Sequence, residues 1–398
     1  MNAAPRIVAG RTIRKLPLES IMNILLLEPY FTGSHAAWSK GYAACSRHRV
    51  DNLQLPGRHW KWRMHGGAVT LAQRFLDHDR PVDLLLASAM LDLTTFLALT
   101  RRKSSGLKSL LYFHENQLTY PWSPRDGDPP ARRDAHYGFI NFTSALAADW
   151  VAFNSHYHRQ AFLDELPRFL KSFPDFQELA SIEGIRRKSL VLPLGLDLQR
   201  FDVHRPPFEE EPEPHVPPLI LWNHRWEYDK NPEDFFQALF VLQEQGIAFR
   251  LAVLGESFRE RPAIFQQARE RLGERIVHFG YVADFEEYAR WLWNADVLPV
   301  TAAHDFFGIS VVEAMYCNCH PLLPRRLAYP EHIPEEYHGN YFYGDQPDLV
   351  EQLKKLLCPS GPRQGPEPGS FIRRYDWALQ GPIYDALFDR LVMRKSPD

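Results

Sequence analysis

Short apolar runs recur along the chain, and most are followed by a polar or glycine-containing turn and then by a segment with helical character. Asn23–Glu28, Val82–Ser88 and Ser109–Phe113 are three such runs in the first half. Uninterrupted apolar runs of about four to eight residues are typical of strands buried in a parallel sheet. Their alternation with helices predicts an α/β fold.

The pattern occurs twice, on either side of an acidic, proline-rich stretch at Pro206–Pro218. The strands expected before it are Asn23–Glu28, Val50–Leu55, Val82–Ser88, Ser109–Phe113, Val151–Phe153 and Ser189–Leu192. Those expected after it are Leu219–Trp222, Phe249–Leu254, Ile276–Phe279, Ala295–Val300 and His320–Pro324. Two such halves predict two Rossmann-like, doubly wound domains with a ligand cleft between them.

The domain boundaries follow from these patterns. We expect a disordered extension at 1–21, a first Rossmann-like domain at 22–202, a linker at 203–218, a second Rossmann-like domain at 219–374 and a terminal helix at 375–398 that packs back across the domains. The extension is basic and lacks an apolar centre, so we do not interpret it as a secretory signal. In the terminal helix, Leu379, Tyr384 and Phe388 are among the expected packing positions.

Composition narrows the class of protein. The chain has 398 residues and 45% hydrophobic content, which is enough for the hydrophobic cores of two domains. Its net charge of -3 argues against a polycation that coats nucleic acid. Four cysteines follow no disulfide or zinc spacing, and no stretch is long enough for a transmembrane helix. We therefore expect a cytoplasmic protein that reaches any RNA through local patches.

The most informative stretch joins the expected strand Ala295–Val300 to a helix that begins after Gly308. Such a turn directs unpaired N–H groups and the positive helix end at one point, which suits a diphosphate. Asp305 and Glu313 bracket the turn, and carboxylates there would bind hydroxyls better than phosphates. The pattern indicates a nucleotide-sugar site, although an ordinary loop with a capping Asp and a solvated Glu would look the same.

Two cations follow a strand in the second half. Arg225 and Lys230 are five positions apart, and both could reach a diphosphate held at Gly308. Asp126 and Asp128 have the spacing of a metal-binding pair, but their Pro- and Arg-rich surroundings favour a turn. We therefore expect catalysis without a metal ion or another cofactor, with cations and helix ends stabilising the leaving group.

Two turns of the first half also carry candidate chemistry. Gly33 opens a strand–turn–helix unit that suits an anion, although one glycine is weak support for a nucleotide site. His114–Gln117 follows the strand Ser109–Phe113 directly, at the edge where open α/β sheets bind ligands. Four polar residues there favour a functional site over a plain loop.

Basic and aromatic residues alternate through Arg58–Arg63. Cations contact phosphates and indole rings stack on bases, so the segment is a candidate RNA or sugar surface. The alternative is a half-buried segment whose tryptophans pack and whose cations extend to solvent.

These residues together resemble the GT-B retaining glycosyltransferases of glycosyltransferase family 4, and more narrowly the tRNA-queuosine alpha-mannosyltransferases. The resemblance extends from about Met22 to the terminal helix. It is carried by Phe113–Leu118, Trp60–Arg63, His224–Glu227 with Asp229 and Lys230, and Phe306–Gly308, besides the acidic pair Asp305 and Glu313.

The resemblance implies roles for individual residues. The catalytic set would be His114, Arg225, Lys230 and Asp305. The donor would be bound by Gly33, Arg225, Lys230, Gly255, Asp305, Phe307, Gly308, Ile309, Ser310 and Glu313. The acceptor and its tRNA would be bound by Arg58, Trp60, Lys61, Trp62, Arg63, Glu115, Asn116 and Gln117.

The implied reaction is the transfer of mannose from GDP-mannose to the queuosine nucleoside of tRNA-Asp. One departure affects the donor: the family usually has Glu where this chain has the shorter Asp305. A different sugar donor or a lipid or polysaccharide acceptor is thus an alternative, with Arg101–Lys103 and Arg186–Lys188 as short membrane-docking candidates. An inactive protein that binds nucleotide-sugar or tRNA is the alternative from another class.

Overall fold

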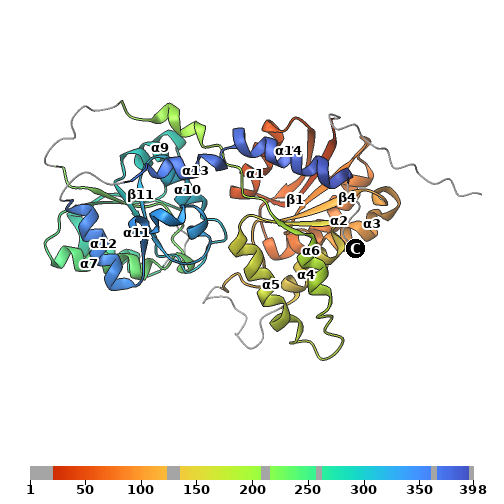
Figure 1. Cartoon of the computed structure of the whole chain (residues 1–398), viewed down its shortest axis with the longest axis horizontal. Helices are drawn as coiled ribbons and strands as arrows, with labels where there is room; N and C mark the ends of the chain where they lie inside the picture. Colours follow the sequence, from red (N-terminus) through yellow and green to blue (C-terminus); the bar gives the residue numbers. More distant parts are fainter. Residues whose placement is uncertain (1–20, 123–134, 208–215, 257–261, 360–364, 394–398) are drawn as a thin grey trace, which may run out of the picture.

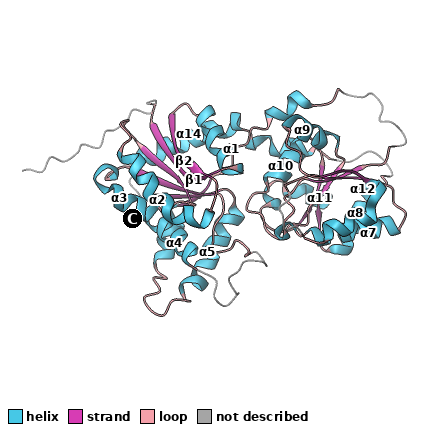
Figure 2. Ribbon diagram, turned by 180° about the vertical axis from the view of Figure 1, so that it is seen from behind, coloured by secondary structure: helices cyan, strands magenta, loops and turns pink. Residues whose placement is uncertain are grey.

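The structure is a computed structural model that describes residues 21–122, 135–207, 216–256, 262–359 and 365–393. The expected extension (except Ile21), the Asp126–Asp128 turn and the acidic centre of the linker lie outside the described residues. Figure 1 shows two α/β halves side by side, and Figure 2 shows the fanned strands of the first half from behind.

The first half is built on a six-stranded parallel sheet with the order β2-β1-β3-β4-β5-β6. Its strands are β1 Asn23–Phe31, β2 Arg49–Pro56, β3 Leu84–Ser88, β4 Lys108–Phe113, β5 Trp150–Phe153 and β6 Ser189–Val191. Its helices are α1 Gly33–Cys45, α2 Trp60–Leu76, α3 Leu93–Ser104, α4 His136–Ala147, α5 His156–Leu170 and α6 Ser181–Lys188.

The second half has a six-stranded parallel sheet with the order β12-β11-β10-β7-β8-β9. Its strands are β7 Leu219–Trp222, β8 Arg250–Val253, β9 Ile276–Phe279, β10 Val297–Pro299, β11 His320–Pro324 and β12 Phe342–Tyr343. The helices after β7 are α7 Pro232–Glu244, α8 Ile264–Leu272, α9 Phe285–Asn294, α10 Ile309–Tyr316, α11 His338–Tyr341, α12 Gln346–Leu357, α13 Pro368–Ile372 and α14 Trp377–Met393.

The strand orders locate the ligand-binding edge of each sheet. In an open α/β sheet, ligands bind at the carboxyl edge where the chain reverses its direction of winding. That reversal lies between β1 and β3 in the first half and between β7 and β10 in the second. The predicted α/β class of two doubly wound domains is confirmed, and each domain has a defined place for its site.

The terminal helix α14 is part of the first half's core rather than a free end. Trp38 donates from its indole nitrogen to the Tyr384 hydroxyl at 3.2 Å, and Tyr42 donates to Asp385 at 2.9 Å. Figure 1 shows α14, in blue, lying over α1. Tyr384 and Phe388 are buried as expected, but Leu379 is 53% exposed, so that packing position was wrong.

The largest error in the predicted elements concerns α2. The sequence pattern predicts a helix over Gly66–Leu76, but α2 begins at Trp60, so most of the alternating basic and aromatic segment is helical. Two adjacent glycines, Gly66 and Gly67, masked its continuity, because glycine disfavours a helix interior. The short α6 was not expected from the sequence. Among the described residues, no helix has the length and apolar character needed to cross a membrane.

Candidate active site

The turn after β10 has the expected form. Gly308 adopts a left-handed φ of 84° and precedes α10, and no side chain among the described residues caps this helix. A Cβ on Gly308 would lie 3.0 Å from the ring of Tyr329, so the position favours glycine for both its backbone and its surroundings. No side chain in the described part of the chain therefore competes with an anion for the backbone N–H groups at the start of α10.

Lys230 is held beside this turn with only 8% of its surface exposed. Its ammonium nitrogen lies 2.9 Å from the His304 carbonyl oxygen, 3.2 Å from Asp229 and 3.3 Å from Asp305. Burial by itself would lower the pKa of Lys230, but the carboxylates of Asp305 and Asp229 outweigh it and raise the pKa. Lys230 therefore carries a positive charge at a fixed position.

Asp305 is ionised by the same arrangement. Burial would raise its pKa, but Lys230 and a hydrogen bond from Tyr329 at 2.8 Å lower it. The ammonium group donates a hydrogen bond to the His304 carbonyl and forms ion pairs with Asp229 and Asp305. A diphosphate oxygen that binds Lys230 would therefore replace one contact, and replacement of Asp305 would release this carboxylate toward a sugar hydroxyl.

Arg225 lies at the boundary between the halves. Its guanidinium is 3.0 Å from Glu227 and 3.5 Å from the hydroxyl of Tyr120 in the first half. The loop that carries it passes close to Gly255, which has a φ of 97°; a Cβ there would be 1.9 Å from the His224 carbonyl oxygen. The predicted importance of Gly255 therefore has a local cause, because only glycine lets the two loops meet.

Glu313 and Ser310 form a second group on α10. The Glu313 carboxylate accepts from Arg200 at 3.0 Å and from Tyr288 at 2.9 Å, and burial raises its pKa. The Ser310 hydroxyl is 2.8 Å from Nδ1 of His224. Both side chains already have protein partners, so a ribose hydroxyl would join a network that exists in the protein.

One predicted donor contact is corrected by the structure. The side chain of Phe307 is 4% exposed and packs against His332 and Tyr375 in the core. Its carbonyl also accepts from His332 at 2.6 Å. Phe307 thus anchors the turn and its side chain does not face a ligand.

In the first half, His114 is buried directly after β4, with 7% of its surface exposed. Neither ring nitrogen has a hydrogen-bond partner among the described residues. Burial lowers its pKa far below the usual value, and the neighbouring His35 and His158 lower it further. His114 is thus a neutral histidine with two buried ring nitrogens that have no partner among the described residues, which calls for an explanation.

The three residues after His114 differ in what they can reach. Asn116 is fully buried, and its side-chain oxygen accepts from the backbone N–H groups of Leu118 and Thr119. The expected acceptor contact from Asn116 is therefore wrong, because the side chain stabilises its own turn. Glu115 is partly exposed, and Arg225 of the second half helps to lower its pKa, whereas Gln117 is half-buried.

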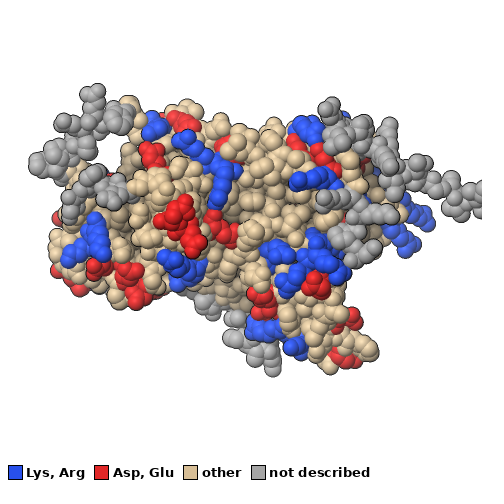
Figure 3. Space-filling model, in the orientation of Figure 1, with Lys and Arg blue, Asp and Glu red and all other residues tan. Residues whose placement is uncertain are grey.

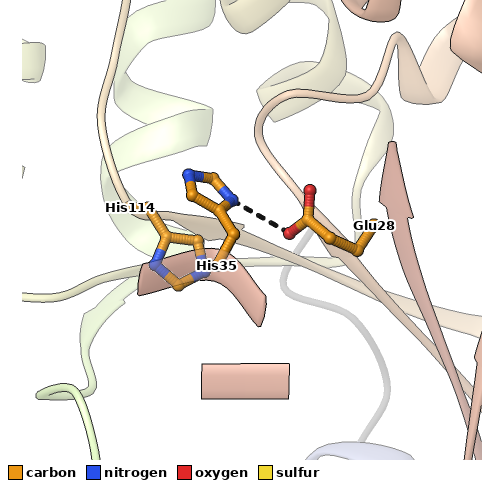
Figure 4. Close-up of side chains that lie close together, drawn as sticks. All are labelled: Glu28, His35 and His114. Carbon is orange, nitrogen blue, oxygen red and sulfur yellow. Dashed lines mark hydrogen bonds and ion pairs between the residues drawn. The ribbon is translucent and has the colours of Figure 1, made fainter. Parts of the chain in front are cut away.

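A buried pair in this half was not assigned a role from the sequence. Glu28, at 0% exposure, accepts from Tyr30 N–H at 2.9 Å and from Ser88 Oγ at 3.0 Å, and lies 3.0 Å from Nδ1 of His35. Figure 4 shows the His35 ring between Glu28 and His114. The sequence signal was one acidic residue inside an otherwise apolar strand.

Among the described residues, the potential ligand atoms of Glu28, His35 and His114 lie within 4.8 Å of one another, a spacing that would admit a metal ion. A hydrogen bond brings Glu28 and His35 together, and His35 stacks on His114 with ring centroids 4.2 Å apart. These two contacts explain the short distances among the three side chains without a metal ion.

Several contacts join the halves around the site. Ser155, which caps α5, donates from its hydroxyl to the Phe306 carbonyl at 2.6 Å. Tyr228 donates to the Pro121 carbonyl at 2.7 Å, and the rings of Tyr120 and His304 are 4.8 Å apart. The loops after β4 and β5 of the first sheet therefore contact the loops after β7 and β10 of the second.

The segment Arg58–Arg63 divides into packed and exposed side chains. Trp60 packs on Tyr137 with ring centroids 5.1 Å apart, so the alternative of a packing tryptophan holds for it. Trp62 is 63% exposed and is the better stacking candidate. Lys61 extends its ammonium over the rings of Trp60 and Trp122, while Arg58 is exposed.

Comparison with known proteins places these features in a family. A profile described as tRNA-queuosine alpha-mannosyltransferase N-terminal matches residues 23–196, and one described as glycosyl transferases group 1 matches residues 206–363. The tRNA-queuosine alpha-mannosyltransferase of Drosophila melanogaster is 35% identical over 318 residues, which are 79% of this chain and 82% of that protein.

Weaker sequence similarity and structural similarity extend to other glycosyltransferases and to a sucrose-phosphate synthase. A GDP-mannose-dependent alpha-(1-6)-phosphatidylinositol dimannoside mannosyltransferase of Mycobacterium tuberculosis is 28% identical over 36% of this chain and 38% of its own length. The apo lipopolysaccharide outer core galactosyltransferase WaaB has a TM-score of 0.59 at 12% identity, covering 93% of this chain and 100% of that chain. Sucrose-phosphate synthase from Thermosynechococcus elongatus has a TM-score of 0.64 at 15% identity, with 93% and 99% covered. The fold is GT-B.

Proposed function

The chain belongs to the tRNA-queuosine alpha-mannosyltransferase family, and on that premise we propose that it transfers mannose from GDP-mannose to the queuosine nucleoside of tRNA-Asp. The observation that best supports this reaction is that Lys230, Asp305 and the uncapped start of α10 lie together at one switch point. Glycosyl transfer to a hydroxyl needs a stabilised diphosphate and an ordered sugar, and this group of residues suits both tasks.

The donor diphosphate would lie against α10, with Lys230 and Arg225 completing its charge neutralisation. Because the Lys230 ammonium is already ionised and held in position, little reorganisation is needed when charge develops on the leaving oxygen. Asp305 would then bind the sugar and Glu313 the ribose. Transfer proceeds with retention of configuration, with the departing oxygen helping to accept the proton of the attacking hydroxyl.

The first half would supply the acceptor side. His114 would contact the donor sugar and Glu115 an acceptor hydroxyl. Trp62 would stack on an anticodon base, and Arg58, Lys61 and Arg63 would contact phosphates. Gly33, with a φ of 49° and open space beside its Cα, would let the backbone approach the donor phosphates.

Catalysis is proposed to need no metal ion or other cofactor, since Arg225, Lys230 and the helix start neutralise the leaving group. We propose the cytoplasm as its compartment, because all four cysteines are free thiols and its acceptor is a tRNA.

A lipid acceptor receives less support. Figure 3 shows Lys and Arg gathered over α6. However, Lys188 of this helix donates to the carbonyls of Leu146 and Ala148, and Lys103 of α3 donates to the Phe75 carbonyl. These two lysines satisfy the carboxyl ends of neighbouring helices, so their ammonium groups are already engaged within the protein.

The test is mass spectrometry of tRNA nucleosides after incubation of queuosine-containing tRNA with the full chain and GDP-mannose, UDP-glucose or UDP-galactose. We expect a hexose on queuosine with GDP-mannose alone. Transfer from another donor would show that Asp305 has changed the sugar, and transfer only to lipid would refute the tRNA acceptor. Donor binding without transfer or hydrolysis would identify an inactive binding protein.

A further inference from the structure

His35 occupies the first turn of α1 with 4% of its surface exposed, and a carboxylate faces each of its ring nitrogens. Nδ1 is hydrogen-bonded to Oε2 of Glu28 at 3.0 Å, whereas Nε2 lies 3.7 Å from Oε2 of Glu115, an ion-pair distance that is too long for a hydrogen bond. An ionised carboxylate can only accept hydrogen bonds. A neutral imidazole could donate to one of the two carboxylates, whereas the doubly protonated ring can face both.

The two carboxylates are held very differently. Glu28 is fixed at the switch point of the first sheet by Tyr30 N–H and the Ser88 hydroxyl. Glu115 has a side chain that is 31% exposed. His35 thus connects a rigid internal anchor to a partly exposed carboxylate whose pKa Arg225 and His304 of the second half also lower.

We propose that His35 is a positioning residue that, as an imidazolium between Glu28 and Glu115, orients the Glu115 carboxylate to bind the vicinal hydroxyls of the acceptor nucleoside. The inference rests on the proposed function and deepens it. A carboxylate with two acceptor oxygens matches a vicinal diol, which presents two O–H donors close together. Its orientation decides which hydroxyl remains free to attack the sugar.

The charged state of His35 follows from every group that faces it. Burial would lower the pKa of His35, but Glu28 and Glu115 outweigh burial and raise it to about 10. His114 stacks on the ring and is itself kept neutral, and Tyr30 approaches edge-on with centroids 6.0 Å apart. His35 therefore remains protonated across the physiological pH range.

The first experiment needs no acceptor. Full-length protein labelled with ¹⁵N-histidine is titrated by NMR, and His35→Gln identifies the His35 signals. We expect both His35 ring nitrogens to stay protonated at pH 8.5, and Glu28→Gln to shift the titration to lower pH. A neutral His35 at pH 7.5 would overturn the proposal. So would stoichiometric zinc in the purified protein that disappears in His35→Gln, because a metal ion and a proton compete for the same nitrogens.

The second experiment is a double-mutant cycle with queuosine-containing tRNA as acceptor. His35→Gln and Glu115→Gln should each lower kcat/KM for tRNA by roughly 10- to 100-fold, the usual effect of a charged hydrogen bond. Their double variant should be no worse than Glu115→Gln alone, and donor affinity should be unchanged. Additive losses, or an equal loss of donor affinity in His35→Gln, would show a merely structural role.

His78→Gln is the matched control, because His78 also faces a carboxylate, Asp51 at 3.8 Å, outside the site. It should leave kcat/KM for tRNA unchanged, and a loss equal to that of His35→Gln would overturn the proposal. Failure of the wild-type protein to modify tRNA would refute the proposed function, whereas the NMR result judges the His35 contacts independently.

Discussion

The two switch points differ in how their charged groups are partnered. In the second half, Lys230 has three acceptors, and Asp305 and Glu313 each have two donors. In the first half, both nitrogens of His114 lack a partner among the described residues, and Glu115 has one distant contact. In the proposed function, Lys230, Asp305 and Glu313 on the donor side are thus paired before the substrate arrives, whereas Glu115 on the acceptor side is left for the substrate.

This contrast predicts that, of the changes considered, loss of Lys230 lowers the transfer rate the most. Lys230→Ala should lower the transfer rate on the order of 100-fold or more, as removal of one transition-state donor does. Steady-state kinetics with saturating GDP-mannose measures it. Lys355→Ala, which removes an exposed lysine paired only with Glu351 in the described structure, should be neutral. Near-normal turnover of Lys230→Ala would contradict its assigned role.

The rigidity of the donor side can be tested at Gly255. A Cβ there would lie 1.9 Å from the His224 carbonyl oxygen, whereas one on Gly246, also at positive φ, meets nothing within 4 Å. Gly246→Ala should cost about 1–2 kcal/mol of unfolding free energy, the backbone cost by itself. Gly255→Ala should cost more, measured by denaturant unfolding. Equal losses would mean that the close approach of the two loops is unimportant.

Substitution of Trp62 should weaken tRNA binding without changing the affinity for GDP-mannose. Trp62→Ala should weaken tRNA binding about 10-fold, the lower range of one lost base–aromatic stack. Filter binding measures it, and Trp62→Phe should recover most of the affinity. Val69→Ala, another exposed change on α2, is the control. An altered affinity for GDP-mannose in Trp62→Ala would break the separation of the two sides.

Acid should act mainly through the histidines of the site. Burial, reinforced by Lys230, lowers the pKa of His304 to about 4. Between about pH 6.5 and pH 4 the unfolded chain binds a proton at His304 that the native chain does not, so stability falls as the pH falls. In His304→Gln this contribution to the pH dependence of the unfolding free energy should disappear. Urea unfolding at several pH values would detect the change. An unchanged slope would contradict a neutral His304.

Metal removal should have the smallest effect. If cations and the start of α10 alone stabilise the leaving group, EDTA followed by desalting should leave the transfer rate unchanged. Loss of activity that added Mg²⁺ or Zn²⁺ restores would refute the proposed metal independence. The assay is the same nucleoside mass spectrometry, with and without the added ion.

The sequence by itself determined the elements and the chemistry of the donor turn. Buried parallel strands are apolar along their length, so runs such as Ile24–Leu27 were visible without a structure. Gly308 before a helix and the spacing of Arg225 and Lys230 are local patterns, and the structure places all three at one switch point.

Only the tertiary structure decided which side chains are free to act. Asn116 was expected to bind a ligand, but it stabilises its own turn, and the side chain of Phe307 is in the core. Conversely, Ser88 donates to Glu28 from 60 positions away in the sequence, and Glu115 faces His35 from 80 positions away. Local sequence patterns fix backbone conformation, whereas burial and hydrogen-bond partners depend on residues that folding brings together.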